Sequence, residues 1–388
     1  MREIAIVSIT RAPIGRAHRG NLRDTRPDSL AGVVIKEALR RAEGLDPAEV
    51  GDVVLGCAFP EGEQGMNVAR IASFVAGLPH EVPALTVNRF CSSGLQALAV
   101  AGGRIALGGT DVAVAGGVES MSLIGMAGQK PTANPELFDR YPEAFVSMGN
   151  TAENVASRYG VTRQAQDEFA LASHQRAVAA QRAGRFTDEI VEVQTRVYEE
   201  GGTREVRVTE DEGPRPDTTL EGLAKLKPAF HATGGTVTAG SSSQLSDGAA
   251  AAVLMTRARA EELGLAPLGI FRHFVVVGVP PEVMGIGPVP AIRKLCQVSG
   301  VSLDEIDCFE LNEAFAAQAI YCVRELGLDP AKVNPNGGAI ALGHPLGATG
   351  AILTAKLLYE LARTKGRYGV VSMCIGGGMG AAGLFERA

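Results

Sequence analysis

Cys91 is the residue whose setting most strongly indicates chemistry. It lies in NRFCSSGLQALAVAGG, directly before a predicted Ala-rich helix with Ser92 and Ser93 in its first turn. Unpaired backbone N–H groups and the helix dipole at that end stabilise a thiolate, so the position predicts a lowered pKa. The same N–H groups can hold an oxyanion once the sulfur attacks a carbonyl. We therefore predict a nucleophile here, although most free cysteines only fill a core.

His344 has the same kind of setting in the C-terminal part of the chain. It lies in GGAIALGHPLGATG, where Pro345 suits the first position of a second Ala-rich helix. A histidine near a thiol is the pairing that nucleophilic catalysis needs, because the base removes the thiol proton. The alternative is a hydrogen-bonded loop histidine, and this describes the other five better: His18, His80, His174, His231 and His273.

Cys374 is a second candidate cysteine, at the end of the predicted strand GVVSMCI. A thiol at a strand end, followed by glycines that let a ligand approach the backbone, can act as a general acid or base. Gly376 can supply an N–H to an oxyanion. Taken alone, such a cysteine is more often a core residue. The other cysteines lie in apolar runs without C-x-x-C spacing, which indicates neither a metal site nor a redox dithiol: Cys57, Cys296, Cys308 and Cys322.

Two pairs of similar segments, in the same order, indicate an internal duplication. LRRAEGLDPAEVGDVVLGCAF at 39–59 is similar to LCQVSGVSLDEIDCFELNEAF at 295–315. In each part a Val-Asn step then leads to an Ala-rich helix, past Cys91 in the first case and His344 in the second. Chance likeness of α/β patterns is the alternative, and two ordered matches favour duplication. A duplicated unit would bring both helix starts face to face across a pseudo-twofold axis.

The middle of the chain differs from both repeats. Residues 151–186 contain two helical patterns broken at Gly160, and Thr162 is placed to cap the second. We expect an insertion that covers one face. The expected division is a first half at 1–121 and 240–262, a loop domain at 122–239 and a second half at 263–388.

Bulk composition narrows the class of protein. The chain has 388 residues, of which 46% are hydrophobic and 21% charged, as in ordinary globular proteins. The net charge of −6 argues against a nucleic-acid partner. No stretch approaches the roughly 20 apolar residues of a membrane span, and the N-terminal run resembles a strand more than a signal peptide. We expect a cytoplasmic protein.

These residues together resemble the thiolase family. The implied fold is α/β: a duplicated thiolase-type fold of two similar halves, with mixed sheets packed in layers of helices, plus an inserted loop domain. Assembly as a homodimer or homotetramer is also implied. The matching motifs are VNRFCSSGLQA around Cys91, GGVESMS at 116–122, KPAF with GGTVTAG at 227–240, SDGAA at 246–250, NEAFA at 312–316, GGAIALGHPLGATG at 337–350 and CIGGGMG at 374–380.

The resemblance implies a role for each candidate residue. Cys91 would accept the acyl group and His344 would activate it, while Cys374 would handle the α-proton of acetyl-CoA. Asn312 would position a water that joins His344 in one oxyanion hole. The backbone N–H groups of Cys91 and Gly376 would form the other. No permanently bound cofactor or metal is implied; coenzyme A and acyl-CoA are substrates, with CoA contacts at Arg215, Phe230, Ala239, Ser243 and Phe315.

Departures from the family pattern bear on the reaction direction. Ser147 stands where many short-chain biosynthetic thiolases have His before Met-Gly, and Ser241 replaces an Asn that commonly follows T-A-G. CSSG and SSQLSDGAA resemble the degradative branch, which favours cleavage of 3-ketoacyl-CoA, with a β-oxidation subunit as a further partner. The alternatives are acetoacetyl-CoA synthesis by an acetyl-CoA C-acetyltransferase, a ketoacyl synthase, against which Cys374 argues, and a non-catalytic protein that binds CoA or lipid.

Overall fold

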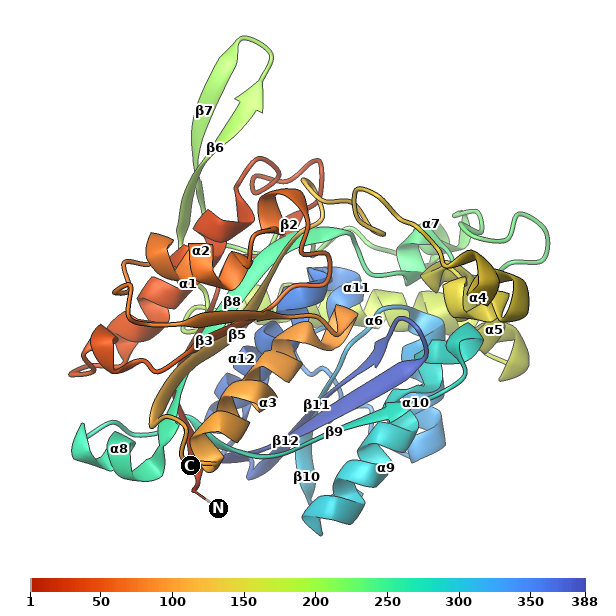
Figure 1. Cartoon of the computed structure of the whole chain (residues 1–388). Coiled ribbons are helices and arrows are strands. Elements are labelled where there is room, and N and C mark those ends of the chain that lie inside the picture. The colour runs from red at the N-terminus through yellow and green to blue at the C-terminus, as the bar shows by residue number, and fades with distance from the viewer. Residues whose placement is uncertain (1) are drawn as a thin grey trace.

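The computed structural model describes residues 2–388, in which strands and helices alternate along both halves (Figure 1). The strands are β1 (Ile4–Arg11), β2 (Gly15–Arg16), β3 (Val53–Gly56), β4 (Ala84–Val87), β5 (Val112–Ser120), β6 (Val193–Glu199), β7 (Gly202–Val208), β8 (Ser246–Thr256), β9 (Gly269–Gly278), β10 (Ile306–Leu311), β11 (Tyr368–Ile375) and β12 (Met379–Arg387). The helices are α1 (Pro27–Arg41), α2 (Val68–Val75), α3 (Ser93–Ala106), α4 (Pro135–Arg140), α5 (Met148–Arg158), α6 (Arg163–Arg182), α7 (Leu220–Ala224), α8 (Arg257–Glu262), α9 (Pro288–Ser299), α10 (Ala316–Leu326), α11 (Ala339–Leu342) and α12 (Leu346–Thr364).

The main sheet consists of two half-sheets that mirror each other in strand order. The order is β4-β3-β5-β8-β1 followed by β9-β12-β11-β10, and β2 pairs with β8. In the first half β3 is parallel to β5, and β8 is antiparallel to both β5 and β1. In the second half β10 is parallel to β11, and β12 is antiparallel to both β11 and β9. This reversed order is what a pseudo-twofold axis produces, and it confirms the predicted duplicated α/β fold.

The two half-sheets are joined into one continuous sheet, which the sequence did not indicate. Strand β1 pairs antiparallel with β9, from Ile4 opposite Phe271 to Ile6 opposite Gly269. Each of these strands would otherwise be an edge with unpaired backbone groups. Their pairing satisfies those groups at the pseudo-twofold axis.

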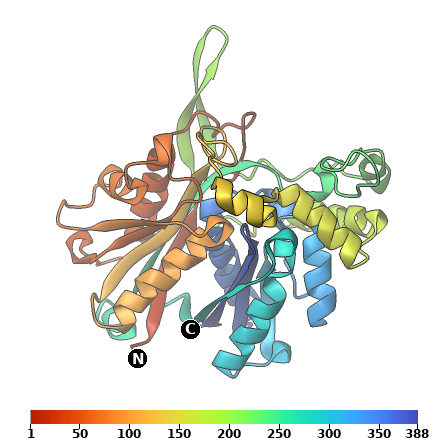
Figure 2. The ribbon, with the colours of Figure 1, turned by 45° about the vertical axis from the view of Figure 1, so that its right-hand side comes forward.

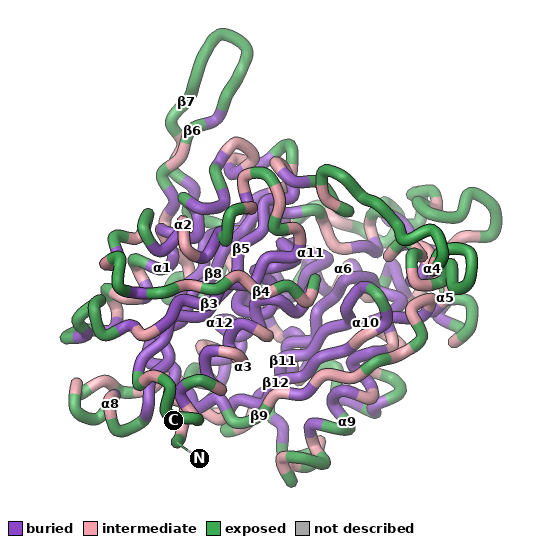
Figure 3. The backbone as a smooth tube through the Cα atoms, viewed as in Figure 1, coloured by how far each residue is buried: buried purple, intermediate pink, exposed green. Residues whose placement is uncertain are grey.

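Helices form three layers around the half-sheets (Figure 2). Helices α1 and α2 share an apolar core with the first half-sheet, and α9 and α10 share one with the second. Helices α3 and α12 pack in a common core with strands from both halves. Figure 3 shows this centre as buried along most of its backbone.

Glycine lets α3 and α12 approach to backbone contact. A Cβ atom at Gly94 would lie 2.8 Å from the Ala351 nitrogen and 2.9 Å from the Gly347 oxygen, so no larger residue fits without a shift. Gly94 comes three residues after Cys91, and Gly347 comes three residues after His344. The contact therefore brings the two helix starts together, as the duplication predicts.

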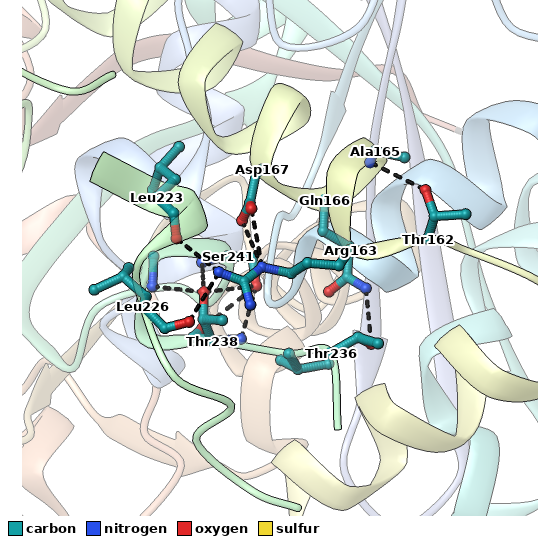
Figure 4. Close-up of polar contacts among 12 residues, drawn as sticks. Thr162, Arg163, Ala165, Gln166, Asp167, Leu223, Leu226, Thr236, Thr238 and Ser241 are labelled. Atoms are coloured by element: carbon teal, nitrogen blue, oxygen red, sulfur yellow. Dashed lines mark hydrogen bonds and ion pairs between the residues drawn. The ribbon is translucent and has the colours of Figure 1, made fainter. Parts of the chain in front are cut away.

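The inserted segment lies over one end of the halves and includes the hairpin β6–β7, which projects outward (Figures 1 and 3). Helix α6 anchors the rest of the segment (Figure 4). Arg163 Nη2 donates to the backbone oxygens of Leu223 and Leu226 at 2.6 and 3.0 Å, and Gln166 Nε2 donates to Thr236 Oγ1 at 3.0 Å. These bonds hold the stretch that carries Phe230.

The start of helix α6 follows the sequence-based prediction. Thr162 Oγ1 accepts a hydrogen bond from the Ala165 nitrogen at 3.2 Å, which confirms the predicted helix cap. Strand β5 ends at Ser120 and β8 begins at Ser246, and we keep the division at 121, 239 and 262 as a proposal. Within residues 2–388 no helix is long and apolar enough to cross a membrane.

The α3–α12 contact predicts the effect of two glycine substitutions in one helix. Gly94→Ala should lower the free energy of unfolding by about 1–3 kcal/mol, because its methyl group meets backbone atoms of α12. Gly103→Ala is the matched control: a Cβ there meets no heavy atom within 4 Å, so stability should rise by roughly 0.5–1 kcal/mol. Urea unfolding measures both, and equal effects would contradict the predicted crossing.

Candidate active site

Cys91 lies in a tight turn between β4 and α3. Phe90 to Ser92 form a 3₁₀ turn, and Phe90 has a positive φ of 42°, which is uncommon for a bulky residue. The Asn88 Oδ1 atom accepts from the Phe90 nitrogen at 2.8 Å and stabilises this turn. Cys91 is 6% exposed and packs against Ala58, Met121 and Leu346. The nucleophile candidate is thus held rigidly at the start of α3.

The environment of Cys91 raises the pKa of its thiol, which corrects the sequence-based expectation. Burial raises the pKa to about 11, the backbone N–H groups of Gly376 and of Cys91 itself lower it, and the charge of Glu119 raises it further. The prediction of a lowered pKa was wrong because desolvation outweighs the N–H groups at the helix start. The thiol form therefore dominates at neutral pH, and forming the thiolate requires a base.

His344 is held in one tautomer. It precedes α12, with Pro345 at the N-cap, one position earlier than predicted. The Thr349 hydroxyl donates to the Pro345 oxygen at 2.9 Å, so it has no second proton to give. It must accept from His344 Nδ1, which lies 2.6 Å away and hence carries the proton. His344 Nε2 is left unprotonated, and burial lowers the pKa of His344 to about 3.

Asn312 faces the free nitrogen of His344. Its Nδ2 atom lies 3.2 Å from His344 Nε2, and its backbone N–H donates to the Ser372 oxygen at 2.9 Å. Asn312 Oδ1 is buried and has no hydrogen-bond partner within residues 2–388. A buried acceptor without a donor is costly. This atom suits a donor from a water or a reacting group, in keeping with the expected role of Asn312.

Cys374 and Gly376 approach Cys91 from the second half. Cys374 is the penultimate residue of β11, is fully buried and packs with Met284 and Phe315. Burial raises the pKa of Cys374 well above its usual value, and Cys91 adds to the increase. The backbone N–H of Gly376 lies close enough to Cys91 to lower the pKa of its thiol, against the larger effect of burial. The structure thus places Asn312 against His344, and Cys374 and Gly376 near Cys91.

The predicted CoA contacts lie at one end of this site. The Phe230 and Phe315 rings meet edge to face with centroids 6.0 Å apart, and the Ser243 nitrogen donates to the Ala314 oxygen at 3.0 Å. Phe230 and Ala239 are exposed, whereas Phe315 is buried in the cluster that contains Cys374. The aromatic pair therefore connects the surface to the reacting thiol.

Arg215, the fifth predicted CoA contact, is also exposed. Its backbone N–H donates to His174 Nδ1 at 3.2 Å, and the nearby Arg215 and Arg16 charges add to the burial that lowers the pKa of His174 to about 4. The segment that carries Arg215 is bonded to the segment that carries Ser243, because Gln244 Nε2 donates to the Gly213 oxygen at 3.4 Å. A cationic guanidinium with this exposure suits an anionic ligand.

Two residues of the site were missed by the sequence reasoning. Thr349 sets the histidine tautomer, and Glu119 lies buried beside Cys91. Glu119 stands within the quoted motif GGVESMS, and Thr349 within GHPLGATG. Both residues belong to motifs of the sequence. Only the tertiary structure shows that Thr349 contacts His344 and that Glu119 lies near Cys91.

The chain combines a buried thiol, a neutral histidine and a second buried thiol in a duplicated α/β fold. This set of groups defines an acyl-transfer enzyme. Residues 4–258 match the family described as "Thiolase, N-terminal domain", and residues 265–387 match "Thiolase, C-terminal domain". The chain belongs to the thiolase family, as its motifs indicated.

Known relatives cover the whole chain. It is 54% identical to the 3-ketoacyl-CoA thiolase of Bacillus subtilis, over 100% of both chains. It is 52% identical to the peroxisomal 3-ketoacyl-CoA thiolase of Homo sapiens, over 99% of this chain and 91% of that one. The crystal structure of the Bacillus anthracis acetyl-CoA acetyltransferase superposes with a TM-score of 0.91 and 42% identity, over 100% of this chain and 99% of that one.

The histidine tautomer can be tested with Thr349→Val. Losing the hydroxyl frees Nδ1 from its acceptor, so kcat should fall by roughly 10- to 100-fold with little change in KM. Thr354→Val in the same helix is the control, since the Thr354 hydroxyl only donates to the Gly350 oxygen. It should leave kcat within about twofold, and an equal loss in both variants would count against the tautomer argument.

The raised pKa of Cys91 predicts how the free protein reacts with iodoacetamide. The thiolate fraction should grow about tenfold per pH unit up to the pKa of about 11, so the rate should still be rising at pH 9. Mass spectrometry of the Cys91 peptide measures the rate, and acetyl-CoA should protect it. Cys296, which is partly exposed, provides an unprotected reference. A plateau by pH 8 would contradict the raised pKa.

Proposed function

We propose that this protein is a 3-ketoacyl-CoA thiolase, which uses free CoA to cleave a 3-ketoacyl-CoA into acetyl-CoA and a shortened acyl-CoA. The observation that carries the proposal is the buried Cys91 thiol, held at the start of α3 and packed against Leu346, two residues after His344. The relatives named 3-ketoacyl-CoA thiolase, at 52–54% identity over nearly the whole chain, support the same reaction.

In the first half-reaction Cys91 attacks the 3-keto carbon. His344 Nε2 takes the thiol proton, since Nδ1 is already protonated and bonded to Thr349. The bond between carbons 2 and 3 then breaks, its electron pair passes to the acetyl-CoA enolate, and Cys374 protonates carbon 2. The acyl group remains on Cys91 as a thioester.

In the second half-reaction free CoA replaces Cys91 on the acyl group. The CoA thiol loses its proton to the Cys374 thiolate, attacks the acyl carbon, and releases Cys91, which recovers the proton held by His344. The exchange has little energetic cost because both esters are thioesters. The sulfur returns to its starting state, so no bound cofactor is consumed.

Charge that develops on oxygen needs stabilisation at two places. The N–H groups of Cys91 and Gly376 are placed to hold the oxyanion formed when sulfur attacks carbon. Asn312 would position a water that joins the protonated His344 in stabilising the enolate oxygen of acetyl-CoA. Fixed donors in a buried site stabilise such charge more strongly than water does.

We assign the CoA moiety to the face that carries the aromatic pair. Phe230 and Phe315 would contact the thiol-bearing arm, with Ala239 and Ser243 beside it. Arg215 would face the nucleotide end, because it is exposed and cationic.

Acetyl-CoA C-acetyltransferase activity is the second candidate. The same residues run the reaction in the condensing direction, and the acetyl-CoA acetyltransferase of Bacillus anthracis is 42% identical to this chain. Ser147 and Ser241, which depart from the biosynthetic pattern, and the higher identity to the degradative relatives favour thiolysis.

We also propose that the protein forms a homodimer or homotetramer. Strand β4 ends the sheet, and apolar side chains beside it are exposed: Leu85 by 42%, Phe74 by 47% and Met66 by 88%. Apolar side chains along a free sheet edge are typical of an interface. A β-oxidation partner and a cytoplasmic location stay predictions, since several relatives carry peroxisomal names.

A substrate panel tests the proposed reaction. Purified protein should consume 3-ketoacyl-CoA only when free CoA is present, with acetyl-CoA and the shortened acyl-CoA formed in equal amounts. Cys91→Ala should abolish this turnover. Condensation of acetyl-CoA without any thiolysis of longer 3-ketoacyl-CoA would favour the acetyltransferase instead.

Partial reactions separate the two cysteines. Cys374→Ala should still accept an acetyl group from acetyl-CoA on Cys91, but should not exchange the acetyl methyl protons with deuterated water. Cys91→Ala should show the reverse, with methyl exchange and no acetyl-enzyme. A general base contributes roughly 10²–10⁴-fold, so NMR and mass spectrometry should resolve the contrast. Wild-type exchange in Cys374→Ala would reassign the base to another residue.

A further inference from the structure

Glu119 is a fully buried carboxylate at the end of β5. Its Oε2 atom accepts from the nitrogens of Ala58 and Gly347 at 2.8 and 2.7 Å. Its Oε1 atom accepts from Gln64 Nε2 at 2.7 Å and from the Phe59 nitrogen at 3.3 Å. Within residues 2–388 it forms no ion pair with Lys, Arg or His. Backbone and amide N–H groups therefore hold a side chain that is usually exposed.

The surroundings of Glu119 favour its ionised form. Every group bonded to the two oxygens is a donor, including the Cys57 thiol at 3.8 Å from Oε1. A protonated carboxyl would set its O–H against an N–H at one of these oxygens. The Gly347 nitrogen also belongs to the first turn of α12, where the helix dipole favours an anion. Burial raises the pKa of Glu119, but the donors oppose that change.

Glu119 connects the two halves at the level of the reacting sulfur. Ala58 belongs to the first half and Gly347 to the second, where it follows His344 by three residues. Ala58 and Leu346, the residue before Gly347, both pack against Cys91. A Cβ atom at Gly347 would lie 2.7 Å from Glu119 Oε2, so this contact needs glycine. The Glu119 carboxylate thus sets the spacing between Ala58, which packs against Cys91, and Gly347 at the start of α12.

The charge of Glu119 also acts on the sulfur itself. Two titratable groups act on the sulfur of Cys91: Glu119 from β5 and Cys374 from β11. The donors around both Glu119 oxygens favour its carboxylate form, whereas burial raises the pKa of Cys374. The charge of Glu119 opposes the thiolate, which makes proton transfer to His344 necessary before attack.

We propose that Glu119 is a positioning residue that fixes the separation of Cys91 and His344 and holds a carboxylate beside the reacting sulfur. This inference rests on the proposed function of Cys91 as the nucleophile. No cofactor or further ligand is involved. A role confined to packing would affect stability and leave the pH dependence of Cys91 unchanged.

Two substitutions separate the spacing from the charge. Glu119→Gln removes the negative charge and turns an NH₂ group toward N–H donors. Because a charge of the same sign as the thiolate is lost, the pH profile of Cys91 alkylation should move down by about one unit. In the same variant kcat should fall at least about tenfold, with the KM for CoA changed less than about twofold. Glu119→Asp keeps the charge but is one methylene shorter. It should lower kcat and leave the alkylation profile as in the wild type.

Asp52→Asn provides the matched control. Asp52 is also a buried carboxyl, but it pairs with Arg104 near the far end of α3, so its loss should leave the alkylation profile unchanged. A wild-type profile and kcat in Glu119→Gln would overturn the proposal. If that variant does not fold, as judged by thermal melting, a wild-type kcat in Glu119→Asp would overturn it instead. Alkylation needs no substrate, so the profile still tests Glu119 if the wild type shows no thiolysis.

Discussion

The backbone contact between α3 and α12 is the constraint on which the rest of the structure depends. Gly94 of one helix and Gly347 of the other bring the two helix starts within van der Waals contact. Cys91 precedes α3 and His344 precedes α12, so the close approach of the helices sets the distance between the thiol and the base. The pairing of β1 with β9 and the hydrogen bonds of Glu119 reinforce the same junction. The half-sheets and outer helices serve to hold this crossing in place.

Burial at the junction governs the chemistry as well as the geometry. It raises the pKa of Cys91 and lowers that of His344, so both groups are neutral before substrate binds. A neutral thiol and a neutral imidazole avoid the cost of an ion pair away from water. Proton transfer is then coupled to the attack on substrate, where oxyanion donors stabilise the charge that forms. The inserted segment, anchored on α6, adds the face to which we assign CoA.

Much of the fold and the candidate site could be predicted from the chain alone. The likeness of 39–59 to 295–315 correctly predicted the duplication, and the second pair of similar segments predicted that the helix starts at Cys91 and His344 lie face to face. The Thr162 cap followed from a local pattern. The joined half-sheets, the tautomer set by Thr349 and the contacts of Glu119 did not, because each depends on partners distant in sequence. The pKa of Cys91 was predicted in the wrong direction, since a helix start is visible in a sequence and the depth of burial is not.

By itself, the sequence determined the types and order of the reacting groups, the repeat that relates them, and the family to which the chain belongs. These are local properties: a cysteine before a helix, a histidine before a proline, glycines where backbone must approach. Only the tertiary structure decided the protonation of the two central groups and the bonds that orient them. The physical reason is that desolvation and hydrogen-bond partnership arise from all the atoms around a group, and folding brings those atoms from positions as far apart as Ala58 and Gly347.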